Sequence, residues 1–146
     1  MTPHQINRIR ESWSRLKEVD PALVGEVFYS RLFAEAPGVQ HMFSQSKAEQ
    51  GRKLMSMLSL MLNKLGQEQD LQDELEKLAS RHVQYGVKER HYEQVGKSLL
   101  WTLQKALADI WDENLEAAWL AWYQKVADVM KKASYAPKEK EVPGRK

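Results

Sequence analysis

The stretch Leu78-Ala-Ser-Arg-His-Val-Gln-Tyr-Gly86 decides the fold because it places a histidine on the apolar side of a helix. Leu71, Leu75, Leu78 and His82 are spaced by four, three and four residues, so they share one helical face. An imidazole on a core-facing surface loses water and needs a partner for each ring nitrogen. A metal or metal cofactor is one such partner, and a backbone carbonyl of an ordinary core is the other. This run of residues alone favours the carbonyl.

Length and composition indicate one globular domain. The chain has 146 residues, of which 42% are hydrophobic and 29% charged, and this is enough for a sizeable core. It contains no cysteine, which excludes disulfides and thiolate metal sites and suits a reducing compartment. Residues 1–10 do not read as a signal peptide, and no apolar run is long enough to cross a bilayer. We therefore expect a cytoplasmic protein without a membrane partner.

The charge is unevenly distributed along the chain. Six basic and two acidic residues follow from Lys131 onward, so the net charge of +2 comes from the C-terminal end and the remainder is slightly acidic. This distribution argues against a nucleic-acid partner. Residues 135–146 contain two prolines and little to bury, and they predict a basic, disordered tail after a domain of residues 1–134.

The remaining pattern is helical, with no alternation typical of strands. Thr2 and Gln5 read as a capping box around Pro3, and Asp70 reads as the cap of the helix that carries His82. In the second helix Leu23 is expected on the buried face. The expected helical segments are 2–16, 20–37, 48–65, 70–86, 89–107 and 112–134, with a short aromatic segment between the second and third. The fold class is therefore all-α, with six or more helices.

Four motifs, taken in order, carry a family resemblance. They are Phe28-Tyr-Ser-Arg-Leu-Phe33 with Pro37 and Phe43, Gln50-Gly-Arg-Lys-Leu54, Arg81-His82 with Tyr85-Gly86-Val87, and His91-Tyr92-Glu-Gln-Val95-Gly96. Their order and spacing over residues 1–134 resemble a haem globin. The chain is similar to bacterial single-domain haemoglobins and to the globin half of flavohaemoglobins. Residues 11–13 and 52–55 resemble neuroglobin and, most closely, the Hell's Gate type of bacterial globin.

The resemblance implies a globin fold around a pocket for haem b, with His82 as the axial iron ligand. Tyr29 and Gln50 would be distal groups that stabilise bound dioxygen by donating hydrogen bonds. The distal position holds Gln50 where animal globins have histidine, which leaves the sixth iron site free for gas. The residues expected to contact the cofactor are Met42, Phe43, Gln50, Lys53, Leu54, Met57, Leu78, Arg81, His82, Val87, Tyr92 and Val95.

Each of these side chains also has an ordinary structural role open to it. Tyr29 would serve as a core aromatic with its hydroxyl at the surface, and Gln50 as a solvated residue near a helix start. Methionines such as Met57 commonly fill core space. Lys53 and Arg81 are charges of the kind that solvent covers on a helix surface.

The resemblance leaves three functions open. The first is reversible dioxygen binding for storage, delivery or scavenging, and the second is nitric oxide dioxygenation with a separate reductase. The third, a haemless regulatory module, is disfavoured by His82, Tyr29 and Gln50 together. Tyr92 matches a flavohaemoglobin tyrosine beside the axial histidine, but the partner glutamate of that site falls at about Ser134. The expected partners are therefore dioxygen, carbon monoxide and nitric oxide, and the expected state is a monomer or a weak homodimer.

Overall fold

A computed structural model of the 146-residue chain describes residues 1–84 and 87–135. Residues 85–86 and 136–146 lie outside the described part, so the predicted end of the fourth helix at Gly86 falls there, as does the predicted tail of residues 135–146 except Tyr135, the last residue of the sixth helix. The helices are α1 (Pro3–Leu16), α2 (Pro21–Glu35), the 3-10 helix η1 (Pro37–Met42), α3 (Lys47–Asn63), α4 (Glu68–Gln84), α5 (Glu89–Ala106) and α6 (Glu113–Tyr135). The described residues form no strand, and this confirms the all-α prediction.

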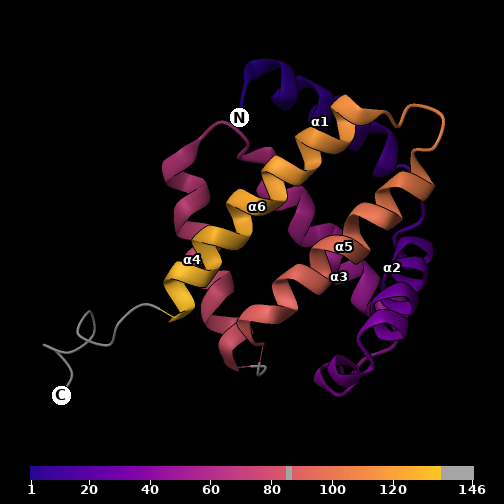
Figure 1. Cartoon of the computed structure of the whole chain (residues 1–146), viewed down its shortest axis with the longest axis vertical. Coiled ribbons are helices and arrows are strands. Elements are labelled where there is room, and N and C mark those ends of the chain that lie inside the picture. The colour runs from indigo at the N-terminus through magenta and orange to yellow at the C-terminus, as the bar shows by residue number, and fades with distance from the viewer. Residues whose placement is uncertain (85–86, 136–146) are drawn as a thin grey trace, which may run out of the picture.

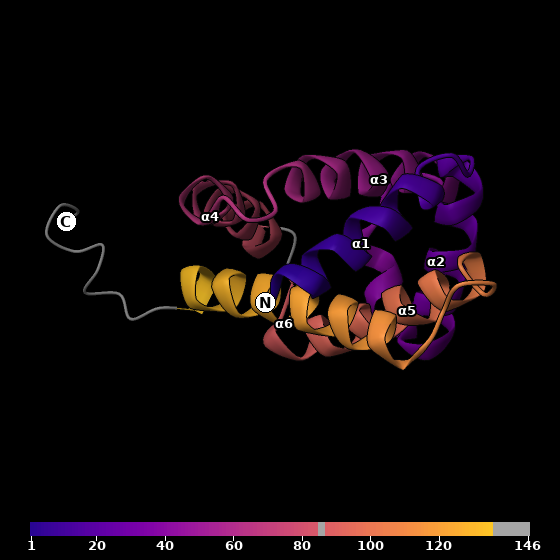
Figure 2. The same ribbon diagram turned by 90° about the horizontal axis from the view of Figure 1, so that it is seen from above.

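The helices form two layers. Figure 2 shows α3 and α4 on one side of the molecule and α5 and α6 on the other, with α2 closing one end. Figure 1 shows α6 crossing the molecule diagonally, with α1 at one of its ends. The main neighbours of α2 are α3 and α5, whereas α4 makes its main contacts with α6. In the described ranges, no helix is both long and apolar enough to span a membrane.

Local sequence signals explain where the first helices begin. The Thr2 hydroxyl accepts the backbone N–H of Gln5, and the Gln5 side chain accepts the backbone N–H of Thr2, which confirms the predicted capping box. Asp20 accepts the N–H of Ala22 ahead of α2, and Pro21 then occupies the first helical position. These side chains satisfy N–H groups that a helix start leaves without a backbone partner.

Two local expectations were wrong. Leu23 is 56% exposed, whereas Val24, Phe28 and Leu32 are buried. Leu23 lies about 100° around the helix from Val24, which takes it off the buried arc. Asp70 lies inside α4, which begins at Glu68 and so before the predicted cap. A single capping residue type did not fix the helix start here, because helix ends are the least determined part of such a pattern.

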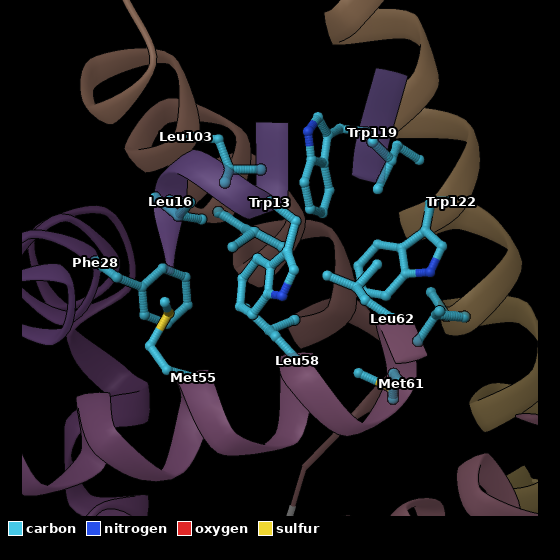
Figure 3. Packing of buried hydrophobic residues seen from close by; sticks show 14 of the residues in the cluster. Trp13, Leu16, Phe28, Met55, Leu58, Met61, Leu62, Leu103, Trp119 and Trp122 are labelled. Carbon is cyan, nitrogen blue, oxygen red and sulfur yellow. The ribbon is translucent and has the colours of Figure 1, made fainter. Parts of the chain in front are cut away.

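A hydrogen-bonded tryptophan connects α1 to α6 in the core. Trp119 Nε1 donates to the Ser12 hydroxyl at 3.0 Å, and that hydroxyl donates to the carbonyl of Ile9 at 2.9 Å. Trp119 also meets the ring of Trp122 edge to face, with 5.5 Å between ring centroids. Figure 3 shows these indoles above the Leu58 and Met61 side chains of α3. The core thus fixes α6, the long helix that forms one wall of the interior.

The backbones of α2 and α3 touch where two glycines meet. A Cβ on Gly51 would lie 2.5 Å from the Cα of Gly25 and 2.6 Å from the carbonyl oxygen of Pro21. A Cβ on Gly25 would lie 2.5 Å from the carbonyl oxygen of Lys47. These neighbours are backbone atoms, so neither glycine leaves room for a side chain.

We predict that Gly25→Ala lowers the free energy of unfolding. Alanine gains about 1 kcal/mol of helix propensity over glycine, but the added methyl group forces α2 and α3 apart, and overpacking of this kind costs roughly 1–3 kcal/mol. Because the contacts are with backbone atoms, the upper part of that range applies and the net change is a loss. The urea midpoint at constant slope measures it.

The matched control is Gly38→Ala. Gly38 is exposed in η1, and a Cβ there would meet nothing within 4 Å. Its urea midpoint should stay close to that of the parent chain. Equal midpoints for Gly25→Ala and Gly38→Ala would show that the helix contact does not limit stability.

Candidate functional site

An interior cavity lies between the two helix layers. Side chains of every helix except α1 line it, and they are mostly aliphatic or aromatic. Its empty space, counted with the opening to solvent, is about 950 Å³. A concave, mostly apolar cavity of this kind is typical of a site for a small organic cofactor.

The cavity continues into a more polar mouth. Tyr29, Phe43, Leu54 and His82 are among the side chains that line both the cavity and the mouth, so the two form one crevice. The charged side chains that line the mouth, within the described ranges, are all basic: Arg52, Lys53 and Arg81. Arg52 donates to Glu49 at 2.8 Å, at the outer surface of α3. The mouth therefore favours an anionic group near its rim.

His82 forms part of one wall, near the end of α4. Leu71, Leu75 and Leu78 of the same helix face are buried and His82 is half-buried, as their spacing predicts. His82 Nδ1 lies 2.9 Å from the carbonyl oxygen of Leu78. Burial lowers the pKa of His82, the hydrogen bond with Leu78 opposes this, and the charge of Arg81 adds to the lowering.

This environment defines the protonation state of the His82 imidazole. A carbonyl can only accept, so Nδ1 carries the proton and the neutral tautomer has its lone pair on Nε2. The hydrogen bond is the one that an ordinary core histidine would make. It is also the one that orients a histidine for binding a metal through its other nitrogen.

Tyr29 and Gln50 meet on the side of the crevice formed by α2 and α3. Tyr29 is 5% exposed, so its ring is buried. Burial raises the pKa of Tyr29 to about 12, and a hydrogen bond with the Gln50 side chain partly opposes the rise. The raised pKa keeps the Tyr29 phenol protonated at neutral pH, so its hydroxyl is able to donate a hydrogen bond.

Aromatic rings fix the position of the Tyr29 ring. Its centroid lies 4.7 Å from that of Phe28, 5.2 Å from that of Phe43 and 5.9 Å from that of Phe33. Phe33 and Phe43 are themselves 5.5 Å apart. Such ring pairs prefer the edge-on and tilted arrangements found here. Phe43 follows η1, so this short helix is coupled to the orientation of Tyr29.

A second histidine lines the inner cavity at the start of α5. His91 is 7% exposed, and its Nδ1 accepts the backbone N–H of Lys88 at 2.8 Å. In the neutral form Nε2 therefore carries the proton and acts as a donor. Burial lowers the pKa of His91, and the charges of Arg90, Lys88 and His41 lower it further.

Two tyrosines connect α5 to α6 at the far side of the cavity. The Tyr123 hydroxyl donates to the Tyr92 carbonyl at 2.6 Å, and burial raises the pKa of Tyr123. A Cβ on Gly96 would strike the Tyr123 ring at 2.6 Å, so glycine makes room for this contact. Lys131 Nζ lies 5.9 Å from the centroid of the Tyr92 ring. A cation therefore lies near the Tyr92 ring.

The structure brings all the sequence-predicted site residues to this crevice. Those on the inner cavity, the mouth or both are Tyr29, Met42, Phe43, Gln50, Lys53, Leu54, Met57, Leu78, Arg81, His82, Val87, Tyr92 and Val95. Their contact with a cofactor stays a prediction.

The contribution of α6 to the cavity wall was not predicted from the sequence. Trp122, Tyr123, Val126, Ala127 and Met130 all line it. Their spacing of three to four residues was visible as an apolar helix face, but it did not distinguish a face that lines a cavity from one that fills a core.

Comparison with known proteins gives matches over most of the chain. The family model described as Globin matches residues 26–130. A leghemoglobin from Canavalia lineata is 32% identical over 142 residues, which cover 88% of this chain and 93% of the leghemoglobin. A flavohemoprotein from Vibrio cholerae is 29% identical over 132 residues, covering 88% of this chain and 33% of that protein. The chain thus spans about a third of the length of the flavohemoproteins that it matches.

A solved structure shows the same architecture. The bacterial globin from Campylobacter jejuni superposes with a TM-score of 0.79 at 28% identity, over 92% of this chain and 96% of that one.

We predict that the chain without cofactor loses stability in mild acid. The pKa of His82 is lower in the folded chain than its ordinary value of 6.5, so the unfolded chain binds more protons below that pH. The contribution of neutral His82 to the free energy of unfolding is therefore complete above about pH 6.5. It is lost as the pH falls toward the pKa of His82 in the folded chain. His91, whose pKa is also lowered, acts in the same direction. Urea unfolding at a series of pH values measures the decrease.

His82→Gln removes the titrating group, so the decrease in the free energy of unfolding between about pH 7 and pH 5 should be smaller in this variant. A variant that also carries His91→Gln should show the smallest decrease. An acid dependence that is identical in His82→Gln and the parent chain would contradict the assignment.

Proposed function

The chain belongs to the globin family, and from this premise we propose that it is a haem protein that binds dioxygen reversibly, for storage, delivery or scavenging. One observation carries the proposal. His82 of α4 and the polar side chains of Tyr29 and Gln50, from α2 and α3, line the same crevice. A metal-binding imidazole and polar donors for a small ligand are the groups that such a protein needs.

The side chains around the crevice fit haem b held without a covalent bond. His82 is neutral and has its Nε2 lone pair for the iron, while the aliphatic and aromatic walls suit a flat macrocycle. The two carboxylates of haem b need cationic or N–H partners. Lys53, Arg81 and the Nε2–H group of His91 are the candidates at the mouth and at the start of α5. Covalent attachment through cysteine does not arise, since the chain has none.

Haem, when bound, would supply an iron site for the gas, His82 would hold that iron, and the residues around the crevice would control how long the gas stays. The Tyr29 hydroxyl donates to a ligand that carries negative charge, and the Gln50 amide orients that hydroxyl or donates itself. A hydrogen bond to a charged acceptor contributes about 1.5–3 kcal/mol. A bound gas that carries negative charge would gain more from these donors than carbon monoxide does, so these two residues would favour dioxygen.

Nitric oxide dioxygenation with a separate reductase is the alternative. The glutamate that accompanies the matching tyrosine in flavohaemoglobins falls at about Ser134 in this sequence, which disfavours this alternative. Sustained conversion of nitric oxide to nitrate, at the rate at which a reductase restores the ferrous protein, would favour the enzyme. A single turnover for each reduction would favour the binding protein.

Finer assignments are part of the proposal. Residues 11–13 and 52–55 relate the chain to neuroglobin and most closely to the Hell's Gate type of bacterial globin. The lack of cysteine suits a cytoplasmic site of action. We expect the protein to work as a monomer or a weak homodimer.

We predict that His82→Ala loses haem or binds it weakly, because the change removes the axial ligand and leaves a void beside α4. Haem absorption per protein after gel filtration measures the loss. The matched control is His4→Ala, which changes an exposed histidine on α1 and should retain haem. Equal haem content and equal ferrous spectra in the two variants would refute His82 as the ligand.

We predict that Tyr29→Phe speeds dioxygen release by about tenfold or more, since a lost hydrogen bond of 1.5–3 kcal/mol corresponds to roughly one to two decades in an equilibrium constant. The ring and its aromatic contacts are retained in this variant, so the change reports on the hydroxyl. Stopped-flow displacement of dioxygen measures the rate.

Gln50→Leu should raise the rate of dioxygen release by an equal or smaller factor than Tyr29→Phe. The two effects need not add, because both groups act on one ligand. Carbon monoxide release in the same variants serves as the internal control and should change less. Dioxygen release that neither substitution alters would show that Tyr29 and Gln50 do not contact the ligand.

A further inference from the structure

The methionines of this chain are concentrated around one cavity. The chain has six methionines, and four of them line the interior cavity: Met42 of η1, Met57 and Met61 of α3, and Met130 of α6. Thioethers are polarisable and fill irregular space around a ligand. They are also the apolar side chains that peroxide oxidises most readily.

The four methionines differ in how accessible they are. Met61 and Met130 are each 4% exposed and line only the inner cavity. Met42 and Met57 are half-buried and line the mouth as well. A small oxidant that enters from solvent therefore meets Met42 and Met57 first.

We propose that Met57 and Met42 are a peroxide-sensitive modification site, where conversion of the thioether to a sulfoxide weakens the hold of the pocket on dioxygen. The inference rests on the proposed function, because it takes the crevice as the place where small oxygen ligands enter. The reactant is hydrogen peroxide, and the reaction changes a wall of the crevice from apolar to polar.

The oxidation is a two-electron transfer from sulfur to peroxide. The sulfur lone pair attacks one oxygen of hydrogen peroxide, an S–O bond forms and the O–O bond breaks. The departing hydroxide takes the proton left on the transferred oxygen, so the products are one sulfoxide and one water. Methionine sulfoxide reductases reverse the change, which makes the site suitable for regulation.

The position of Met57 explains why its oxidation affects gas binding. Met57 lies seven residues after Gln50 and three after Leu54 on α3, so the three side chains share one helix face. Tyr29, Gln50, Leu54 and Met57 all line the same mouth. A sulfoxide oxygen is a strong acceptor and binds a donor within its reach. Tyr29 and Gln50 are among the donors that line this mouth, together with Ser44, Gln45, Arg52, Lys53, Ser56 and Arg81. Because Gln50 shares the helix face of Met57, the sulfoxide competes with the gas for this amide.

The test begins with protein whose haem content and dioxygen spectrum have been measured. A chain that binds no haem or gives no dioxygen spectrum would contradict the proposed function and not this inference. The loaded protein is then treated with hydrogen peroxide, and sulfoxide at each methionine is followed by peptide mass spectrometry. Met57 and Met42 should be oxidised before Met55, Met61 and Met130, which are 6%, 4% and 4% exposed.

A Leu120→Met variant supplies a reporter for simple exposure, because Leu120 is 39% exposed on α6 and does not line the crevice. Oxidation confined to the reporter position, or equal oxidation at all the buried methionines, would overturn the site. Oxidation at Met57 and Met42 without any change in dioxygen release would overturn its effect on gas binding.

Two substitutions at Met57 test that effect directly. Met57→Gln places a polar acceptor on the same wall and should raise the rate of dioxygen release by about tenfold without peroxide, as expected for the loss of one hydrogen bond. Met57→Leu conserves volume and cannot form a sulfoxide. Its dioxygen release, compared before and after peroxide treatment, should change less than that of the parent protein. A peroxide response as large as that of the parent would assign the effect to another residue.

Discussion

The backbone contact between Gly25 and Gly51 is the constraint on which the site depends. Tyr29 lies one helical turn after Gly25, and Gln50 immediately precedes Gly51. When the two helix backbones touch, the phenol of one helix and the amide of the other come within hydrogen-bond reach. A side chain at either glycine would separate the helices, break this pair and change the shape of the cavity. A packing requirement of the core thus sets the geometry of the ligand pocket.

Burial keeps one titratable side chain neutral on each side of the crevice. It raises the pKa of Tyr29 and lowers the pKa of His82, so both groups are held neutral across the physiological range. A neutral phenol donates a hydrogen bond, and a neutral imidazole presents a lone pair. The apolar lining keeps both groups in the form that their proposed roles require. The cations remain outside at the mouth, where water still solvates them.

Much of the fold could be predicted from the sequence because strong local signals coincide with it. The capping box at Thr2 and the leucine face that leads to His82 are both set within a few residues, and both are present in the structure. The prediction that Leu23 is buried was wrong. Its apolar character does not show that it lies one step off the buried arc of the helix. The predicted start of α4 was wrong because residue types that cap helices also occur inside them.

Less of the site could be predicted from the residues alone. The meeting of Tyr29 and Gln50 in one crevice depends on contact between α2 and α3, which only the folded chain brings together. Tyr29, Gln50, Met42 and Met57 were predicted as site residues from the family resemblance. The contribution of α6 to the cavity was not predicted. Its apolar side chains have the same spacing as those of a helix that packs directly into a core.

The way α4 is held has a consequence for how the protein is made and maintained. This helix makes its main contacts with α6, while α2 and α3 lie across the cavity. A molecule that fills the cavity and bonds to His82 would bridge α4 to that opposite wall and supply the contacts that the helix lacks there. Folding and cofactor loading would then be thermodynamically linked, since whatever binds only the native chain stabilises it according to its free concentration. The amount of intact protein in a cell would therefore follow the supply of cofactor as well as the rate of synthesis.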